Sequence, residues 1–70
     1  MNKEIIIAIK RDNLDRIVEF KTNNNKIYNY EMAKEAIIKG IIENAKIIKG
    51  KDDLFYITEN NSNFEKMEEF

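Results

Sequence analysis

Few side chains in this sequence could take part directly in a reaction. The chain contains no histidine and no cysteine, so it lacks the usual general base near neutral pH, the thiolate nucleophile and the common ligands of transition metals. Its only serine, Ser62, has no candidate base beside it. The two glycines, Gly40 and Gly50, are too far apart to form a phosphate-binding loop. We therefore expect no enzymatic activity, no cofactor and no metal centre.

Two pairs of carboxylates remain as candidates for acid–base chemistry or for cation binding. Asp12 and Asp15 fall in one expected turn, and Asp52 and Asp53 fall in another. Oxygen ligands of this kind suit Ca²⁺ or Mg²⁺, but neither turn offers the number of ligands that a cation loop needs. Aspartates also favour turns because they bond their own backbone. That structural role is the interpretation we favour for both pairs.

Basic residues flank both of these turns, and aromatic residues follow the second. The candidate binding surface consists of Lys10, Arg11, Arg16, Lys46, Lys49, Phe55 and Tyr56. If the two turns lie at the same end of a sheet, these side chains form a positive patch beside an aromatic strand. Such a patch could bind a nucleotide or single-stranded nucleic acid through charge and stacking. The alternative is a solvated charged surface, and the aspartates interleaved in both turns favour it.

One segment has the period and the end signals of a helix, which we predict from a cap at Asn29 to a stop at Gly40. Asn29 is a suitable N-cap, and Glu31 lies in the first turn, where the helix dipole favours a negative charge. Ala33, Ala36 and Ile37 fall on one face of this helix. Gly40 can adopt the left-handed conformation that ends helices.

The segments on both sides of the helix have the composition of strands. We predict strands over residues 4–10, 16–22, 45–49 and 54–58, and a very short strand over 27–28, because these runs are rich in Ile and other β-formers between polar turns. The expected fold class is α+β, with the order β-β-α-β-β. It comprises a small, mostly antiparallel sheet with one helix packed on one face.

The C-terminal residues form an acidic tail after a single α+β domain, which we place at residues 1–58. Residues 59–70 contain four glutamates and one lysine. Ser62 and Glu65 have the spacing of a capping box. This spacing predicts a short helix with Phe64 and Met67 on one side, able to pack on the domain.

Composition limits the class of protein further. Seventy residues make one domain, and 12 basic residues against 13 acidic ones give a net charge of −1. This balance provides no bulk attraction to nucleic acid or to an anionic membrane. The longest apolar run, residues 5–9, is far too short to span a bilayer. We expect a cytoplasmic protein with no membrane association.

The order of these segments resembles a family of small proteins of unknown function that is widespread in Firmicutes. The similar segments are residues 8–12, 17–20, 29–33, 40–44, 54–57 and 63–67. They correspond to a strand ending in A-V-R-K-D, a second strand, a helix containing E-A, a G-x-I step, a Tyr-centred strand and a final N-L-x-x-L-P segment. Two positions depart from this pattern. The arginine after the Tyr-centred strand is Ile57 or Thr58 here, and the final proline is Glu68. The resemblance implies the fold and no particular activity.

Two hypotheses about function follow from these observations. The first is a non-enzymatic protein-interaction module, for example an inhibitor of a host system encoded by a phage or mobile element. The second is a nucleotide or single-stranded nucleic-acid binder that uses the candidate binding surface. In the first case alternation along the first strand predicts an outward apolar interface of Ile6, Ala8, Ile17 and Ile48. This interface would support self-association, unless the C-terminal tail folds over it.

Overall fold

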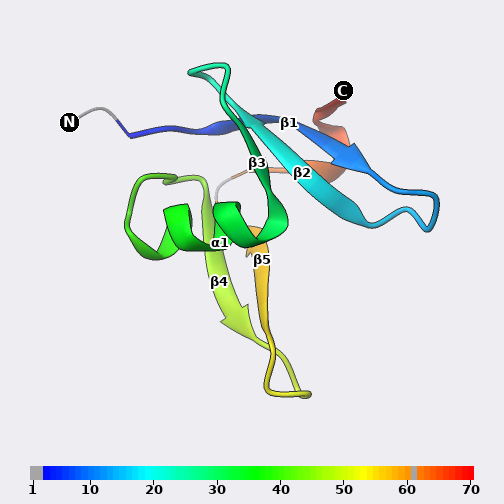
Figure 1. The fold of residues 1–70 in the computed structure, drawn as a ribbon, viewed down its shortest axis with the longest axis vertical. Helices are drawn as coiled ribbons and strands as arrows, with labels where there is room; N and C mark the ends of the chain where they lie inside the picture. The colour runs from blue at the N-terminus through cyan, green and yellow to red at the C-terminus, as the bar shows by residue number, and fades with distance from the viewer. Residues whose placement is uncertain (1–2, 61) are drawn as a thin grey trace.

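A computed structural model describes residues 3–60 and 62–70 and contains a helix, a short 3₁₀ helix and six strands in two sheets (Figure 1). The elements in chain order are β1 (Ile6–Arg11), β2 (Ile17–Thr22), β3 (Ile27–Asn29), α1 (Tyr30–Ile38), β4 (Ala45–Lys49), β5 (Phe55–Glu59), the 3₁₀ helix η1 (Phe64–Lys66) and β6 (Glu68–Glu69). The predicted α+β class and the positions of the predicted strands are confirmed.

The strands form two separate sheets. The larger sheet has the order β3-β2-β1-β6, and β4 and β5 pair only with each other. All pairs are antiparallel except β1 with β6. Helix α1 contacts β2 and β3 of the larger sheet and β4 of the smaller one, and the β4–β5 hairpin extends away from the rest of the molecule (Figure 1). The helix therefore joins two small sheets.

Helix α1 begins and ends as the sequence predicts. The Asn29 side chain accepts a hydrogen bond from the backbone N–H of Met32 at 2.9 Å. At the other end Gly40 has a φ of 79°. The N–H of Ile41 donates to the carbonyl of Ala36, and the N–H of Gly40 donates to that of Ile37. These are the two hydrogen bonds of a Schellman motif, in which a glycine tolerates the left-handed backbone.

The prediction that Ile6 faces outward is wrong, because a β-bulge interrupts the alternation of β1. Ile6 pairs with Thr22, but Ala8 pairs with Lys21, so β1 has one extra residue between these two pairs. A bulge of this kind reverses which residues face the core. As a result Ile6 and Ile9 both lie in the core, Ala8 is buried, and Ile7 is exposed.

The edge of β1 opposite β2 is paired by three different segments. At its start, the N–H of Glu4 donates to Ile41, and the carbonyl of Glu4 accepts from Glu43. At its end, β6 pairs in parallel with Ala8 and Ile9. Between them the side-chain amide of Asn44 takes the place of a strand. It accepts from the N–H of Ile6 at 2.8 Å and donates to the carbonyl of Ile6 at 2.9 Å.

The C-terminal tail packs against the core, but not with the predicted cap. Asn63, not Ser62, caps η1 by accepting the N–H of Glu65. The Ser62 hydroxyl instead donates to the carbonyl of Asn44 at 2.8 Å. Phe64 is buried in the core, and Met67 packs against it. The tail thus contributes to the same core as the strands.

A carboxylate is buried beside this core. Glu4 accepts hydrogen bonds from the hydroxyls of Thr22 at 2.7 Å and Tyr28 at 3.0 Å, and Lys26 lies 3.9 Å away. Burial and the bond to Glu4 raise the pKa of the Tyr28 hydroxyl above its usual value. Tyr28 therefore serves packing and the pairing of Glu4.

Candidate functional site

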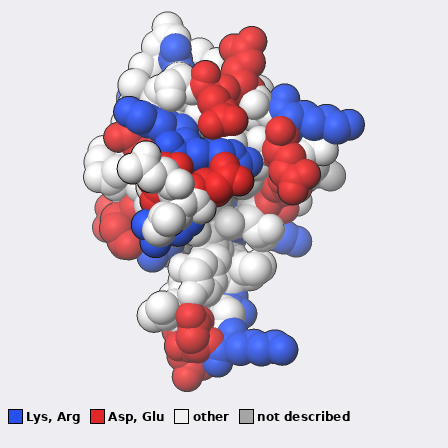
Figure 2. All heavy atoms as spheres, turned by 90° about the vertical axis from the view of Figure 1, so that its right-hand side faces the viewer, with Lys and Arg blue, Asp and Glu red and all other residues white. Residues whose placement is uncertain are grey.

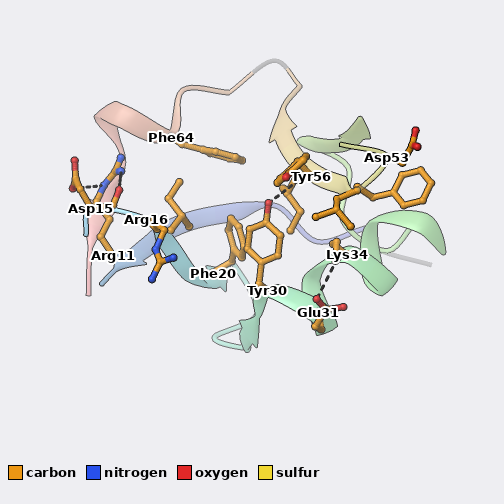
Figure 3. A pocket seen from close by; sticks show the side chains of 14 residues that line it. Arg11, Asp15, Arg16, Phe20, Tyr30, Glu31, Lys34, Asp53, Tyr56 and Phe64 are labelled. Carbon is orange, nitrogen blue, oxygen red and sulfur yellow. Dashed lines mark hydrogen bonds and ion pairs between the residues drawn. The ribbon is translucent and has the colours of Figure 1, made fainter. Parts of the chain in front are cut away.

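A cleft of about 910 Å³ lies between the β4–β5 hairpin and the rest of the molecule (Figure 3). Its lining is mostly aromatic and aliphatic, with charged residues included. The lining residues are Arg11, Asp15, Arg16, Ile17, Phe20, Tyr30, Glu31, Lys34, Asp53, Leu54, Phe55, Tyr56, Ile57 and Phe64. We call this feature the cleft.

One wall of the cleft is formed by the start of β5 and the turn before it. The exposed fractions in this wall are 59% for Leu54 and 55% for Phe55. The Tyr56 hydroxyl donates to the Asp52 carboxylate, so its pKa is raised and that of Asp52 is lowered. Gly50 allows the Tyr56 ring to lie against the turn, because a Cβ there would meet the ring at 2.6 Å. These contacts hold the wall in place.

The opposite wall is an aromatic cluster drawn from three elements. Phe20 of β2 is buried in the core, with its ring centroid 6.0 Å from that of Tyr30 and 5.9 Å from that of Phe64. These separations and the tilted ring planes are typical of favourable aromatic pairs. Figure 3 shows these three rings facing Tyr56 across the cleft. The cleft is therefore apolar at its base.

Tyr30 connects the two walls. It is the first residue of α1, placed by the cap at Asn29. Its hydroxyl oxygen accepts the backbone N–H of Ile57 in β5 at 2.9 Å. Lys34 lies over the Tyr30 ring, 5.7 Å from its centroid, and pairs with Glu31 at 3.2 Å. Tyr30 is thus the polar group that the base of the cleft presents to β5.

Each cationic side chain that lines the cleft lies beside a carboxylate. Arg11 lies 3.7 Å from Asp15 and also donates to the Asp15 backbone carbonyl. Arg16 pairs with Asp12 through two nitrogens, both at 2.9 Å. The backbone N–H of Arg16, more than any other group, holds the pKa of Asp12 below its usual value. Figure 2 shows positive and negative atoms interspersed on one face of the molecule. The cleft has no cluster of positive charge.

The structure brings together four residues of the candidate binding surface and separates the other three. Arg11, Arg16, Phe55 and Tyr56 all line the cleft. The remaining three lie outside its lining: Lys10 pairs with Glu19 at 3.9 Å, Lys49 pairs with Asp53 at 3.5 Å, and Lys46 is exposed on β4.

The members of the predicted apolar interface are also separated. Ile6 and Ala8 are buried, and Ile17 is half-buried, packs on the core and lines the cleft. Ile48 is exposed on β4, outside the cleft. The four residues therefore do not form one exposed patch.

Sequence reasoning missed Phe20, Tyr30 and Phe64 as residues of the site. Phe20 lies in the predicted strand 16–22, Tyr30 in the predicted helix and Phe64 in the predicted tail, and no short motif links them. A usable signal was Tyr30 directly after the N-cap, because a helix start places that side chain beside whatever packs on the first turn.

Comparison with known proteins places the chain in a family. The family model described as "Protein of unknown function (DUF3892)" matches residues 5–66. The chain belongs to the DUF3892 family. The match spans every element from β1 to η1, and it confirms the resemblance to a family of small proteins of unknown function. The searches of curated proteins and of solved structures found no match.

The described part of this DUF3892 chain contains neither a candidate metal site nor a membrane-spanning helix. Within residues 3–60 and 62–70, no three acidic side chains are grouped closely enough to hold a metal ion. The described helices also include none with the length and apolar character needed to cross a membrane.

Proposed function

We propose that this protein is a non-enzymatic binding module that holds an apolar segment of a partner protein in the cleft. The observation that carries the proposal is an exposed aromatic cleft in which the neighbouring charges are already paired. Binding sites for other molecules are typically concave and apolar, with a few polar groups that fix orientation. The cleft has this character, with Tyr30 and Arg11 as polar groups at its walls.

The exposed residues of the hairpin support a protein partner. Leu54 and Phe55 each leave more than half of their surface in solvent although they border a cavity. Full burial of an exposed side chain of this size contributes roughly 1.5–3 kcal/mol, and burying the exposed half of each of these two contributes roughly half of that. Large buried aromatic residues at the centre of an interface often dominate its binding energy. An inhibitor of a host system, encoded by a phage or mobile element, would be one protein of this kind.

A selection from a random peptide library on the immobilised protein tests the proposal. We expect recovered peptides with a large apolar residue, whose binding is weakened tenfold or more by Phe55→Ala. Ile48→Ala is a matched control, because Ile48 is exposed on the same hairpin but outside the cleft. Recovery of no peptide, or equal effects of the two substitutions, would argue against the proposal.

A second candidate function is binding of a nucleotide or of single-stranded nucleic acid. The observation in its favour is that Arg11, Arg16, Phe55 and Tyr56 line the same cleft. The paired carboxylates weaken it, because binding to phosphates depends on available positive charge. A labelled oligothymidylate tests it. Binding that falls steeply with salt and is lost in Arg16→Ala would favour this function over the first.

A further inference from the structure

None of the described strands pairs with the edge of β5 opposite β4. In the β4–β5 hairpin, Gly50 donates to Leu54, and Asn60 donates to Asn44, so the even-numbered residues face the opposite strand. Antiparallel pairs alternate in this way. The backbone groups of Phe55 and Ile57 therefore point away from β4, and the bond from the Ile57 N–H to Tyr30 agrees with this.

Within residues 3–60 and 62–70, three of these four backbone groups have no hydrogen-bond partner. They are the N–H and C=O of Phe55 and the C=O of Ile57. The fourth, the N–H of Ile57, is held by the Tyr30 hydroxyl at 2.9 Å. The Tyr30 oxygen thus occupies the position that the carbonyl of an adjacent strand would take.

This free edge opens into the cleft. Phe55 and Ile57 line the cleft, and Tyr30, Phe20 and Phe64 face them from the opposite wall (Figure 3). An extended chain beside β5 would pair its backbone with the edge. Its side chains alternate between the two faces of the sheet, so one of them could enter the aromatic part of the cleft. Peptides bind in this way at exposed edges of other sheets.

We propose that the cleft takes an extended segment of a partner protein, which pairs as a strand with β5 at Phe55 and Ile57 and replaces the Tyr30 hydroxyl at the Ile57 N–H. This inference rests on the proposed function and adds the mode of binding. At the Ile57 N–H, the bound segment replaces one hydrogen bond with another. The N–H and C=O of Phe55 and the C=O of Ile57 each gain a hydrogen bond. The segment carries a large apolar side chain that packs on Tyr30.

A second copy of this chain fits the edge less well than a single segment does. The edge of β5 faces residues of β2, α1 and η1 across the cleft, so only a narrow chain can enter. The β5 strand of another copy is attached to its own β4 and to its own cleft wall with Tyr30 and Phe64. The partner we infer is therefore a single extended segment.

Peptides recovered from the library selection provide the first test. Versions carrying an N-methyl group at one backbone amide at a time should reveal at least one position where affinity falls tenfold or more, because that amide donates to Phe55 or Ile57. Binding should also slow hydrogen exchange of the Phe55 amide. The Tyr56 amide, which faces β4, serves as an internal control.

The Tyr30→Phe substitution gives a second test, with a distinctive sign. Removing the hydroxyl frees the Ile57 N–H, so peptide affinity should increase roughly threefold to tenfold, the range expected for one hydrogen bond. Tyr28→Phe is the matched control, because it also removes a hydroxyl, but one that donates to Glu4 away from the cleft. We expect Tyr28→Phe to leave peptide affinity unchanged.

The outcomes separate the two proposals. If no peptide binds, both the proposed function and this inference are wrong. If peptides bind in the cleft but tolerate every N-methyl group, or if Tyr30→Phe weakens or does not change their affinity, the strand mode alone is wrong. Protection of the Phe55 amide that rises with protein concentration, in the absence of peptide, would identify a second copy as the occupant and overturn the inference.

Discussion

Among the asparagines that the structure describes, Asn44 should destabilise the protein most when it is replaced with alanine. The amide of Asn44 makes two hydrogen bonds to the backbone of Ile6, at 2.8 and 2.9 Å, and so fills the gap in the sheet beside β1. Ile6 is almost fully buried. Its N–H and C=O would therefore lose their partners in a partly buried position.

The expected loss of stability follows from the free energy of leaving buried backbone groups without hydrogen-bond partners. Each unsatisfied buried group costs about 1–3 kcal/mol. Because Asn44 itself is half-buried, water can partly replace it, and we expect about 2–4 kcal/mol in total. A domain of this size has a free energy of unfolding of roughly 4–10 kcal/mol. The substitution should lower the melting temperature by at least about 8 °C.

Urea denaturation followed by far-UV circular dichroism measures this effect. Asn60→Ala is the matched control, because the Asn60 side chain makes a single exposed bond to Glu43 at 3.4 Å; it should cost less than about 0.5 kcal/mol. Asn44→Asp keeps the acceptor for the Ile6 N–H but sets a carboxylate oxygen against the Ile6 carbonyl, so it should not rescue stability. Equal unfolding midpoints for Asn44→Ala and Asn60→Ala would refute the reasoning.

Four further predictions concern the helix ends and the turns. Asn29→Ala should lower the free energy of unfolding by about 0.5–2 kcal/mol, because the helix loses its cap. Gly40→Val should destabilise the protein more than Gly40→Ala, because the φ of 79° at position 40 is strained for branched residues. Unchanged midpoints of urea unfolding would contradict both predictions. Gly50→Ala should shift the Tyr56 ring, which a Cβ would meet at 2.6 Å, and a near-UV circular dichroism spectrum identical to wild type would speak against this contact. The pKa of Asp12 is lowered in the folded state, chiefly by the backbone N–H of Arg16. The stability that the Asp12 carboxylate contributes is therefore fully present above a pH of about 4 and is lost as the pH falls through the lowered pKa. Asp12→Asn should show a smaller acid-induced loss of stability than the wild type, and parallel curves of stability against pH for the two proteins would rule this out.

The local elements of the fold could be predicted from the sequence because their signals are local. The cap at Asn29, the stop at Gly40 and the strand at residues 45–49 depend on side chains within a few positions, and all three are confirmed. The bulge in β1 could not be predicted. Ile5 to Ile9 form a continuous apolar run, so the sequence contains no alternation that would fix which residues face the core.

The division into two sheets was also beyond local signals. It depends on Asn44, whose side chain pairs with Ile6 38 residues earlier in the chain. An asparagine after Glu43 is equally consistent with a plain turn. The cleft has the same difficulty, because Phe20, Tyr30 and Phe64 come from three distant segments. Four residues of the candidate binding surface flank the two turns that border the cleft and line it: Arg11, Arg16, Phe55 and Tyr56.

The contacts that hold the β4–β5 hairpin to the rest of the molecule also border the cleft. Besides Asn44 with Ile6, the Tyr30 hydroxyl accepts the N–H of Ile57, and the Glu59 carboxylate accepts the N–H of Phe64 at 2.7 Å. Two of these three contacts lie at β5 itself. A bound strand would replace the contact at Tyr30, so the hairpin would then depend on Asn44 and Glu59 for its position. Substitutions at Asn44 should therefore weaken peptide binding although Asn44 does not line the cleft, because the edge and the opposite wall would no longer be held at the spacing of one strand.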